Sequence, residues 1–313
     1  MRSFSFVGKD LKQISTRADK FSRCVDCSFP PQVEGAEIRK LYYEDIAIFK
    51  QKHNVVVYWD EFGVDGIPDG MVVRIELDEP VNGADAIYLI SIDKSIDSLT
   101  GPAKSRALKE AFLHEISHLI LQHPGLVMPS NEKLVSADLL SDMAVSYTRF
   151  FVDEKSQNLD AELMSLTLGF WPQAEFTRLV KATRADFRQI ANEYKMTVES
   201  ALQWAVVRFD GILDAHYMKR DEGTKDIVDW YGKVEECSNV FDEPGTVAGR
   251  AVKDKCDAKS NSSLANYECR AYYEKKETFH DHKDDEVLVI GFRKDNYESF
   301  VIPGTRPEVQ PPY

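Results

Sequence analysis

Two histidines four residues apart, inside a stretch of helical apolar spacing, constrain this sequence more than any other feature. They belong to the run His114-Glu115-Ile116-Ser117-His118. From about residue 103 to 122 the apolar residues recur at helical intervals, and turn-forming Gly-Pro and Pro-Gly pairs flank the stretch. Residues four apart project from the same face of a helix, so both imidazoles can reach one metal ion. We therefore expect a metal-binding helix at this position.

The glutamate that follows the first histidine indicates hydrolytic chemistry. In the H-E-x-x-H pattern of metalloproteases the glutamate, here Glu115, is not a ligand. It takes a proton from the water that the zinc activates, and later passes it to the leaving amine. The pattern thus predicts a Zn²⁺ site with His114 and His118 as ligands and Glu115 as general base and then acid. The competing interpretation is an ordinary amphipathic helix with two surface histidines.

The patterns around this helix predict an α+β fold. A helix at about 35–52 precedes strand candidates at 55–59, 71–77 and 86–92. Helical segments follow near 134–152, 158–170, 173–193 and 196–214, and strand-like stretches lie at 287–292 and 299–303. We expect a small mixed sheet packed on the histidine helix, then a helical bundle and a small strand-containing C-terminal appendage. The strand near 87–92 is expected to offer an edge to which a substrate peptide can add.

Composition divides the chain into four parts. Residues 1–35 are polar, contain Pro30-Pro31 and show no period, which predicts a flexible N-terminal arm. Residues 36–214 hold the sheet, the histidine helix and the bundle, and are expected to form the catalytic domain. Residues 215–235 are expected to be a linker or a helix end, and 236–313 the appendage, whose role the pattern does not indicate.

The part of the chain around the motif resembles the ImmA/IrrE family of zinc metallopeptidases. The resemblance rests on the strand at 87–92, the loop after it, and the run from Ala111 to His123, where a histidine follows the motif at the family's distance. Two further stretches, 168–176 and 194–201 followed by Arg208, are similar to the family's Leu-Leu-Met-Pro segment and its short C-terminal helical module. The resemblance covers roughly 36–214. It implies a peptidase domain that cleaves a specific protein, often a helix-turn-helix repressor.

The third zinc ligand departs from the family's pattern. The family supplies a glutamate in an E-x-x-A-N/D pattern on the next helix, and this sequence holds no clean copy of it. Asp138 is our candidate, with Asp142 one helical turn later placed to hold a ligand histidine by hydrogen bonding. Asp160 is the rival, because Asp160-Ala161-Glu162-Leu163 is similar to a degenerate form of the pattern. Ser117 replaces the family's glycine, one small residue for another.

Charge and composition bear on location and partners. The sequence contains no apolar stretch of signal-peptide or membrane-span length, which predicts a cytoplasmic protein. A net charge of -13 argues against direct binding to nucleic acid or anionic lipid, and suits a basic protein partner such as a helix-turn-helix repressor. No phosphate-binding glycine loop and no Gly-x-Ser-x-Gly elbow is present, so nucleotide-dependent and serine-hydrolase chemistry have no support.

Two other groups of possible metal ligands carry less weight. The five cysteines are an odd number, which does not suit a disulfide framework, and reduced thiols are expected. A zinc site formed by Cys24, Cys27, Cys256 and Cys269 is the alternative. His280-Asp281-His282 lies beside a charged run typical of a solvated loop.

A second hypothesis belongs to another functional class. The same fold can serve as a catalytically inactive protein-binding or sensing module, in which the metal is structural or absent.

Overall fold

The structure, a computed structural model, describes residues 57–58, 70–81, 84–92, 99–120, 126–128, 155–222, 226–231, 246–261, 267–275 and 285–301. These residues form both helices and two sheets, so the fold is of the α+β kind, as expected. They fall into two compact units. Unit 1 contains the described residues up to Pro172 together with Glu193–Thr197, and unit 2 contains Gln173–Asn192 and the described residues from Val198 onward.

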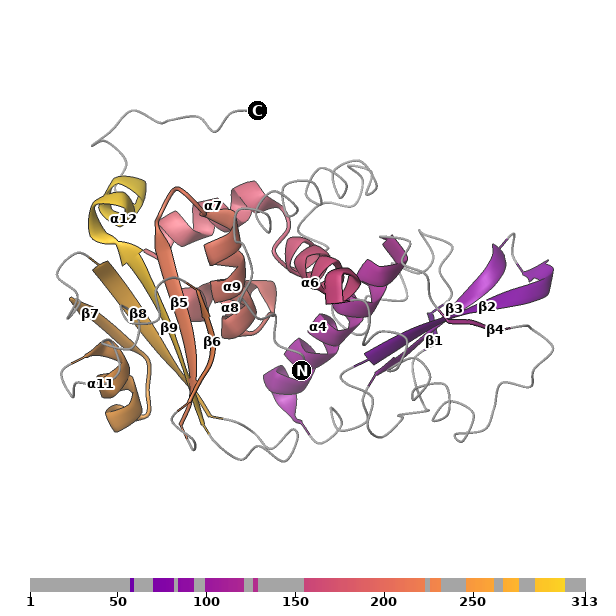
Figure 1. The fold of residues 1–313 in the computed structure, drawn as a ribbon, viewed down its shortest axis with the longest axis horizontal. Helices are drawn as coiled ribbons and strands as arrows, with labels where there is room; N and C mark the ends of the chain where they lie inside the picture. Colours follow the sequence, from indigo (N-terminus) through magenta and orange to yellow (C-terminus); the bar gives the residue numbers. More distant parts are fainter. Residues whose placement is uncertain are drawn as a thin grey trace. The chain divides into compact units, whose positions relative to one another are not determined.

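A mixed four-stranded sheet, in the order β1-β3-β2-β4, lies in unit 1 (Figure 1). β2 (Gly70–Val81) and β3 (Ala84–Ile92) form an antiparallel hairpin. β1 (Val57–Tyr58) pairs parallel with β3, and β4 (Leu126–Met128) pairs parallel with β2. The expectation that the strand near 87–92 offers an edge is wrong, because β3 is paired on both sides. Among the described strands of this sheet, β1 and β4 lie at the edges.

Helix α4 (Gly101–Ile120) carries the motif and packs on β2, β3 and helix α6 (Lys155–Gly169). Phe112, Leu113 and Ile116 are each only 1% exposed, which confirms the predicted apolar face. Ser117 is fully buried, and its hydroxyl donates to the carbonyl of Leu113 at 2.5 Å. Serine therefore satisfies its own polar group within the helix at this buried position.

Two buried hydrogen bonds fasten the segment Glu193–Thr197 to α4 within unit 1. Lys109 Nζ donates to the carbonyl of Tyr194 at 2.5 Å, and the Thr197 amide donates to Glu110 Oε1 at 2.6 Å. Burial lowers the pKa of Lys109 to about 7. The uncharged amine is therefore favoured in the folded protein, where solvation of an ammonium group is lost.

The helix expected over 173–193 is two helices, α7 (Gln173–Ala182) and α8 (Phe187–Tyr194). The chain breaks at Arg184 and Ala185, whose φ angles of 52° and 57° are left-handed. Asp186 then begins α8, since its Oδ1 accepts a hydrogen bond from the Gln189 amide at 3.2 Å. An acidic residue followed three positions later by glutamine is a typical helix start, so the break had a local signal in the sequence.

Helix α9 (Val198–Arg208) is shorter than the expected 196–214 and is buried almost throughout. Within 198–208 only Glu199 and Arg208 are partly exposed. The chain then turns at Gly211 and Asp214, which have φ angles of 72° and 48°, and enters a strand. Trp204 is fully buried, consistent with a packing role.

The sheet of unit 2 is antiparallel, in the order β6-β5-β9-β8-β7. It is formed by β5 (Ala215–Asp221), β6 (Ile227–Tyr231), β7 (Ala258–Asn261), β8 (Tyr267–Glu274) and β9 (Glu286–Arg293). β5 and β6 fall in the range expected to be a linker, yet β5 pairs along its whole length with β9 of the expected appendage. The sheet thus begins at Ala215, and 236–313 does not form a separate appendage.

Helices cover both faces of this sheet. Met218 packs with Ala248 and Ala251 of α11 (Val247–Asp254) in one apolar cluster. The next residue, Lys219, contacts α9 instead, and neighbouring residues of a strand point to opposite faces. The expected strand at 299–303 is wrong over its described part, which belongs to α12 (Lys294–Val301). There Tyr297 stacks on Phe292, with ring centroids 5.7 Å apart.

Lys219 lies buried between two glutamates of unit 2. Its Nζ is 2.9 Å from both carboxylate oxygens of Glu199 on α9, and 3.3 Å from Glu286 Oε2 on β9. Burial lowers the pKa of Lys219, but the two negative charges outweigh this and raise it above its ordinary value. Such buried pairs cost solvation, so they add little net stability.

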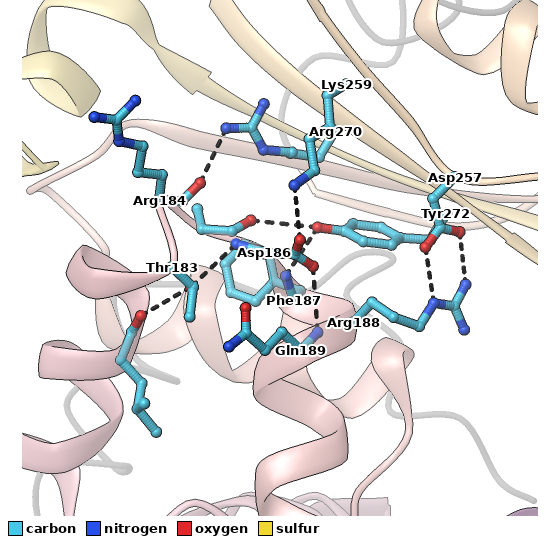
Figure 2. A network of polar contacts seen from close by, with 12 residues as sticks. Thr183, Arg184, Asp186, Phe187, Arg188, Gln189, Asp257, Lys259, Arg270 and Tyr272 are labelled. Carbon is cyan, nitrogen blue, oxygen red and sulfur yellow. Dashed lines mark hydrogen bonds and ion pairs between the residues drawn. The ribbon is translucent and has the colours of Figure 1, made fainter.

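A network of polar contacts attaches the start of α8 to the same sheet (Figure 2). The Tyr272 hydroxyl on β8 accepts a hydrogen bond from the Phe187 amide at 3.0 Å and donates to the Ala185 carbonyl at 3.3 Å. Around it, Arg188 forms two hydrogen bonds of 2.8 and 2.7 Å with Asp257. Burial raises the pKa of the Tyr272 hydroxyl well above its ordinary value. This hydroxyl therefore stays protonated and available to both partners.

Removal of the Tyr272 hydroxyl should destabilise unit 2. In Tyr272→Phe the buried Phe187 amide and Ala185 carbonyl lose their partner, so we expect the free energy of unfolding to fall by about 1–3 kcal/mol. Tyr273→Phe is the matched control: its hydroxyl also donates a hydrogen bond, to Asp285, but at a less buried position where water can replace the lost partner, so the loss of stability should be smaller. Urea unfolding followed by circular dichroism measures both variants. Equal losses in the two would show that the Tyr272 hydroxyl has no special role in holding α8.

The buried amine of Lys109 predicts a specific dependence of stability on pH. Since its pKa is near 7 when folded and near 10.5 when unfolded, the unfolded chain binds more protons between these values. The free energy of unfolding should therefore rise with pH from 7 to 10, by up to about 1.4 kcal/mol per pH unit from this group. Lys109→Met should lack this rise, whereas the exposed-lysine control Lys253→Met should keep it. If the free energy of unfolding of Lys109→Met rose with pH in parallel with that of the wild type, Lys109 would not be the source of the rise.

Candidate functional site

The motif residues of α4 lie together in unit 1. His118 and Glu115 are each 3% exposed, and the side chain of His114 is 18% exposed. The two imidazole rings meet edge to face, with centroids 4.9 Å apart and an interplanar angle of 76°. Their Nε2 atoms are 3.2 Å apart, so the two rings converge on one point, as the spacing predicts.

The donor pair has the dimensions of two zinc ligands. A tetrahedral ion with metal–nitrogen distances of about 2.0–2.1 Å separates two ligand nitrogens by roughly 3.3 Å. The 3.2 Å between His114 Nε2 and His118 Nε2 agrees with this separation. The same distance also suits a hydrogen bond between two neutral imidazoles, one donating and one accepting.

Glu162 of α6 lies next to the first histidine, a position that the sequence patterns did not single out. Its Oε1 is 3.4 Å from His114 Nδ1, the ring nitrogen that faces away from His118. At 3.4 Å the contact is an ion-pair distance and longer than an ordinary hydrogen bond, so the carboxylate acts through its charge. A negative charge here favours a proton on Nδ1, which leaves Nε2 able to bind a metal. Asp160, the rival third ligand, is two residues earlier and so about 200° around the same helix. The sequence signal that could have identified Glu162 is its place in the run 160–163, which contains the carboxylates of both Asp160 and Glu162.

Glu115 lies against the first residue of β2. A Cβ atom placed on Gly70 would be 3.0 Å from Glu115 Cγ and 3.0 Å from its Oε1. The buried carboxylate thus touches the backbone of the sheet. No periodicity in the sequence indicates this contact, because a glycine after Pro68-Asp69 is typical of a turn.

Most of the other candidate ligands fall in ranges that the structure does not describe. Asp138, Asp142, Cys24, Cys27 and the pair His280 and His282 lie outside the described residues. Within the described ranges, no set of three or more histidine, cysteine, aspartate or glutamate side chains is arranged to hold a metal ion. The structure therefore brings together two nitrogen donors and leaves the third ligand a prediction.

Two of the five cysteines belong to the described part, and neither forms a disulfide. Cys256 is exposed, whereas Cys269 is buried on β8. A four-thiolate zinc site that includes them stays a prediction, because its other two members fall outside the described ranges. None of the described helices is both long and apolar enough to span a membrane.

No family model matches the sequence, and no curated protein matches it. Among solved structures, the chain is similar to a Mycobacterium tuberculosis transcriptional regulator, with a TM-score of 0.51 and 11% sequence identity. The match covers 92% of this chain and 78% of the regulator's chain. At this identity the similarity concerns the fold alone.

Proposed function

We propose that this protein is a zinc-dependent endopeptidase of the H-E-x-x-H kind, which hydrolyses peptide bonds in a specific protein. The observation that carries the proposal is the convergence of His114 and His118, with Nε2 atoms 3.2 Å apart, beside the buried carboxylate of Glu115. Burial of a carboxylate costs free energy, and the retention of this one next to two converging imidazoles supports a chemical role for it.

His114 and His118 would hold the metal. Zinc, when bound, supplies a Lewis acid that polarises the scissile carbonyl and lowers the pKa of water. Glu115 accepts a proton from the attacking water and donates it to the nitrogen of the leaving amine. The charge of Glu162 near Nδ1 of His114 favours a proton on that nitrogen, so that Nε2 keeps its lone pair for the metal. Asp138 is proposed as the third ligand.

The substrate we propose is a basic protein, such as a helix-turn-helix repressor, in the cytoplasm. The resemblance of the motif region to the ImmA/IrrE peptidases suggests this class. The net charge of -13 favours encounter with a positively charged partner, since opposite charges raise the rate of association.

A second candidate function is a protein-binding or sensing module without catalysis. It is favoured by the distance between the two imidazoles, which fits a hydrogen bond as well as a metal site. In that case the two rings form a buried polar pair within α4, and Glu115 serves packing alone.

Metal content distinguishes the two functions. We expect elemental analysis to find about one zinc per chain in the wild type, and His114→Ala to lose it because one of two converging nitrogens is removed. Loss of zinc in Asp138→Ala would support that carboxylate as third ligand. A wild type that remains metal-free after loading with zinc would exclude the peptidase and leave the binding module.

Glu115→Gln should separate metal binding from catalysis. The amide keeps the size of the side chain but cannot accept the proton, so we expect zinc to stay bound and peptide cleavage to fall about 10²–10⁴-fold. Cleavage is measured with fluorescence-quenched peptides taken from basic helix-turn-helix repressors. Unchanged cleavage in Glu115→Gln would show that another residue is the base.

Glu162→Gln should weaken metal binding without abolishing it. Loss of the negative charge beside His114 Nδ1 is expected to lower zinc affinity about 10–100-fold, measured by competition with a chelator. Asp160→Asn is the matched control on the same helix and should leave the affinity unchanged. A larger loss in Asp160→Asn than in Glu162→Gln would instead identify Asp160 as a ligand.

A further inference from the structure

We infer that Gly70 is a positioning residue for Glu115: the missing side chain at the start of β2 leaves the space that the catalytic carboxylate occupies. The inference rests on the proposed function, because it concerns the place of the general base. It assigns a role in the reaction to a residue of the sheet, far from the motif in sequence.

The contact is tighter than most contacts that a real Cβ atom makes. An added Cβ on Gly70 would meet three atoms of Glu115, at 3.0 Å from Cγ, 3.0 Å from Oε1 and 3.2 Å from Cδ. Non-bonded carbon atoms pack best at about 3.5–4.0 Å. All three nearest atoms belong to this one side chain. Even alanine at position 70 must therefore displace Glu115, and not some other neighbour.

Backbone conformation does not explain the glycine. Among the described glycines, those with left-handed φ angles are Gly101 and Gly211, so Gly70 has a backbone that any residue can adopt. Glycine within a strand also weakens it, since it loses more entropy on folding and offers no side chain to pack. Close approach of another group is the usual compensation, and here that group is a buried carboxylate.

Glu115 has little freedom to move aside. Its Cγ position is set by the first side-chain torsion, which is restricted to few rotamers on a helix. A shift of the whole helix is opposed by Phe112 and Ile116, each 1% exposed in the core of unit 1. Such a shift would also carry His114 and His118 with it. A methyl group on Gly70 is therefore expected to move the carboxylate relative to the two imidazoles.

Displacement of the Glu115 carboxylate should affect turnover more than the binding of substrate or zinc. Proton transfer requires the carboxylate within hydrogen-bond reach of the water, whereas the metal is held by the imidazoles. Since a misplacement of about 1 Å can cost on the order of 100-fold in rate, we expect a few tenths of an ångström to lower kcat about tenfold. KM and zinc affinity should change less than twofold.

The test compares zinc-loaded wild type, Gly70→Ala and Gly291→Ala. Gly291 is the matched control, a strand glycine of β9 in unit 2 whose added Cβ would lie 3.3 Å from Cys269 Sγ. Initial rates on a fluorescence-quenched peptide that the wild type cleaves give kcat and KM, and chelator competition gives zinc affinity. Gly70→Ala should lose kcat about tenfold, and Gly291→Ala should keep it within twofold.

A second readout needs no turnover. Acetohydroxamate chelates a metal and can donate a hydrogen bond to a neighbouring carboxylate, so its affinity for the cobalt-loaded protein, read from the visible spectrum, reports the position of Glu115. We expect Gly70→Ala to weaken it severalfold. In a Glu115→Asp background, where the shorter side chain leaves room for the methyl group, the same substitution should change it less than twofold.

These measurements distinguish failure of the role of Gly70 from failure of the proposed peptidase function. A wild type without metal or peptide cleavage overturns the proposed function, and the role of Gly70 with it. An active wild type whose Gly70→Ala variant keeps its kcat and its acetohydroxamate affinity within twofold overturns the role of Gly70 alone. Equal losses of zinc affinity and kcat in Gly70→Ala would also overturn it, since they indicate a general disturbance of the site.

Discussion

The burial of one face of α4 is the constraint on which the candidate site depends. Phe112, Leu113 and Ile116 are almost completely removed from solvent, and each such side chain contributes about 1.5–3 kcal/mol. The motif residues alternate with these apolar positions along α4. Burial of the apolar side chains therefore also sets the positions of the motif side chains. The desolvated carboxylate of Glu115 and the convergence of the two histidines thus follow from ordinary core packing.

The elements packed on α4 provide its polar partners as well as its apolar ones. α6 contributes Glu162 to the outer nitrogen of His114, and β2 contributes the open backbone of Gly70 to Glu115. The segment 193–197 is bound to the middle of the helix, where Lys109 donates to the Tyr194 carbonyl and Glu110 accepts from the Thr197 amide. A helix held on several sides in this way keeps its side chains in few rotamers, which a catalytic or binding site requires.

Unit 2 shows a different use of buried polar groups. Its sheet is covered on both faces, and charged residues such as Lys219 and Glu199 lie inside, where an apolar pair would be as stable. Their value is alignment, since an unpaired charge in any other register of α9 on the sheet would be expensive. α9 is buried almost throughout, so it is a core helix of this unit and presents no broad exposed face.

The sequence alone determined the α+β class, the histidine helix with its buried face, and the convergence of His114 and His118, because these depend on periodicity within one element. A local signal also exists for the break at Asp186, in the residues that begin α8. Only the tertiary structure decided that β3 is paired on both sides, that β5 joins a sheet with β9, and that Glu162 and Gly70 adjoin the motif. These contacts join residues far apart along the chain, and helical or strand spacing carries no information about which distant element will pack against which face.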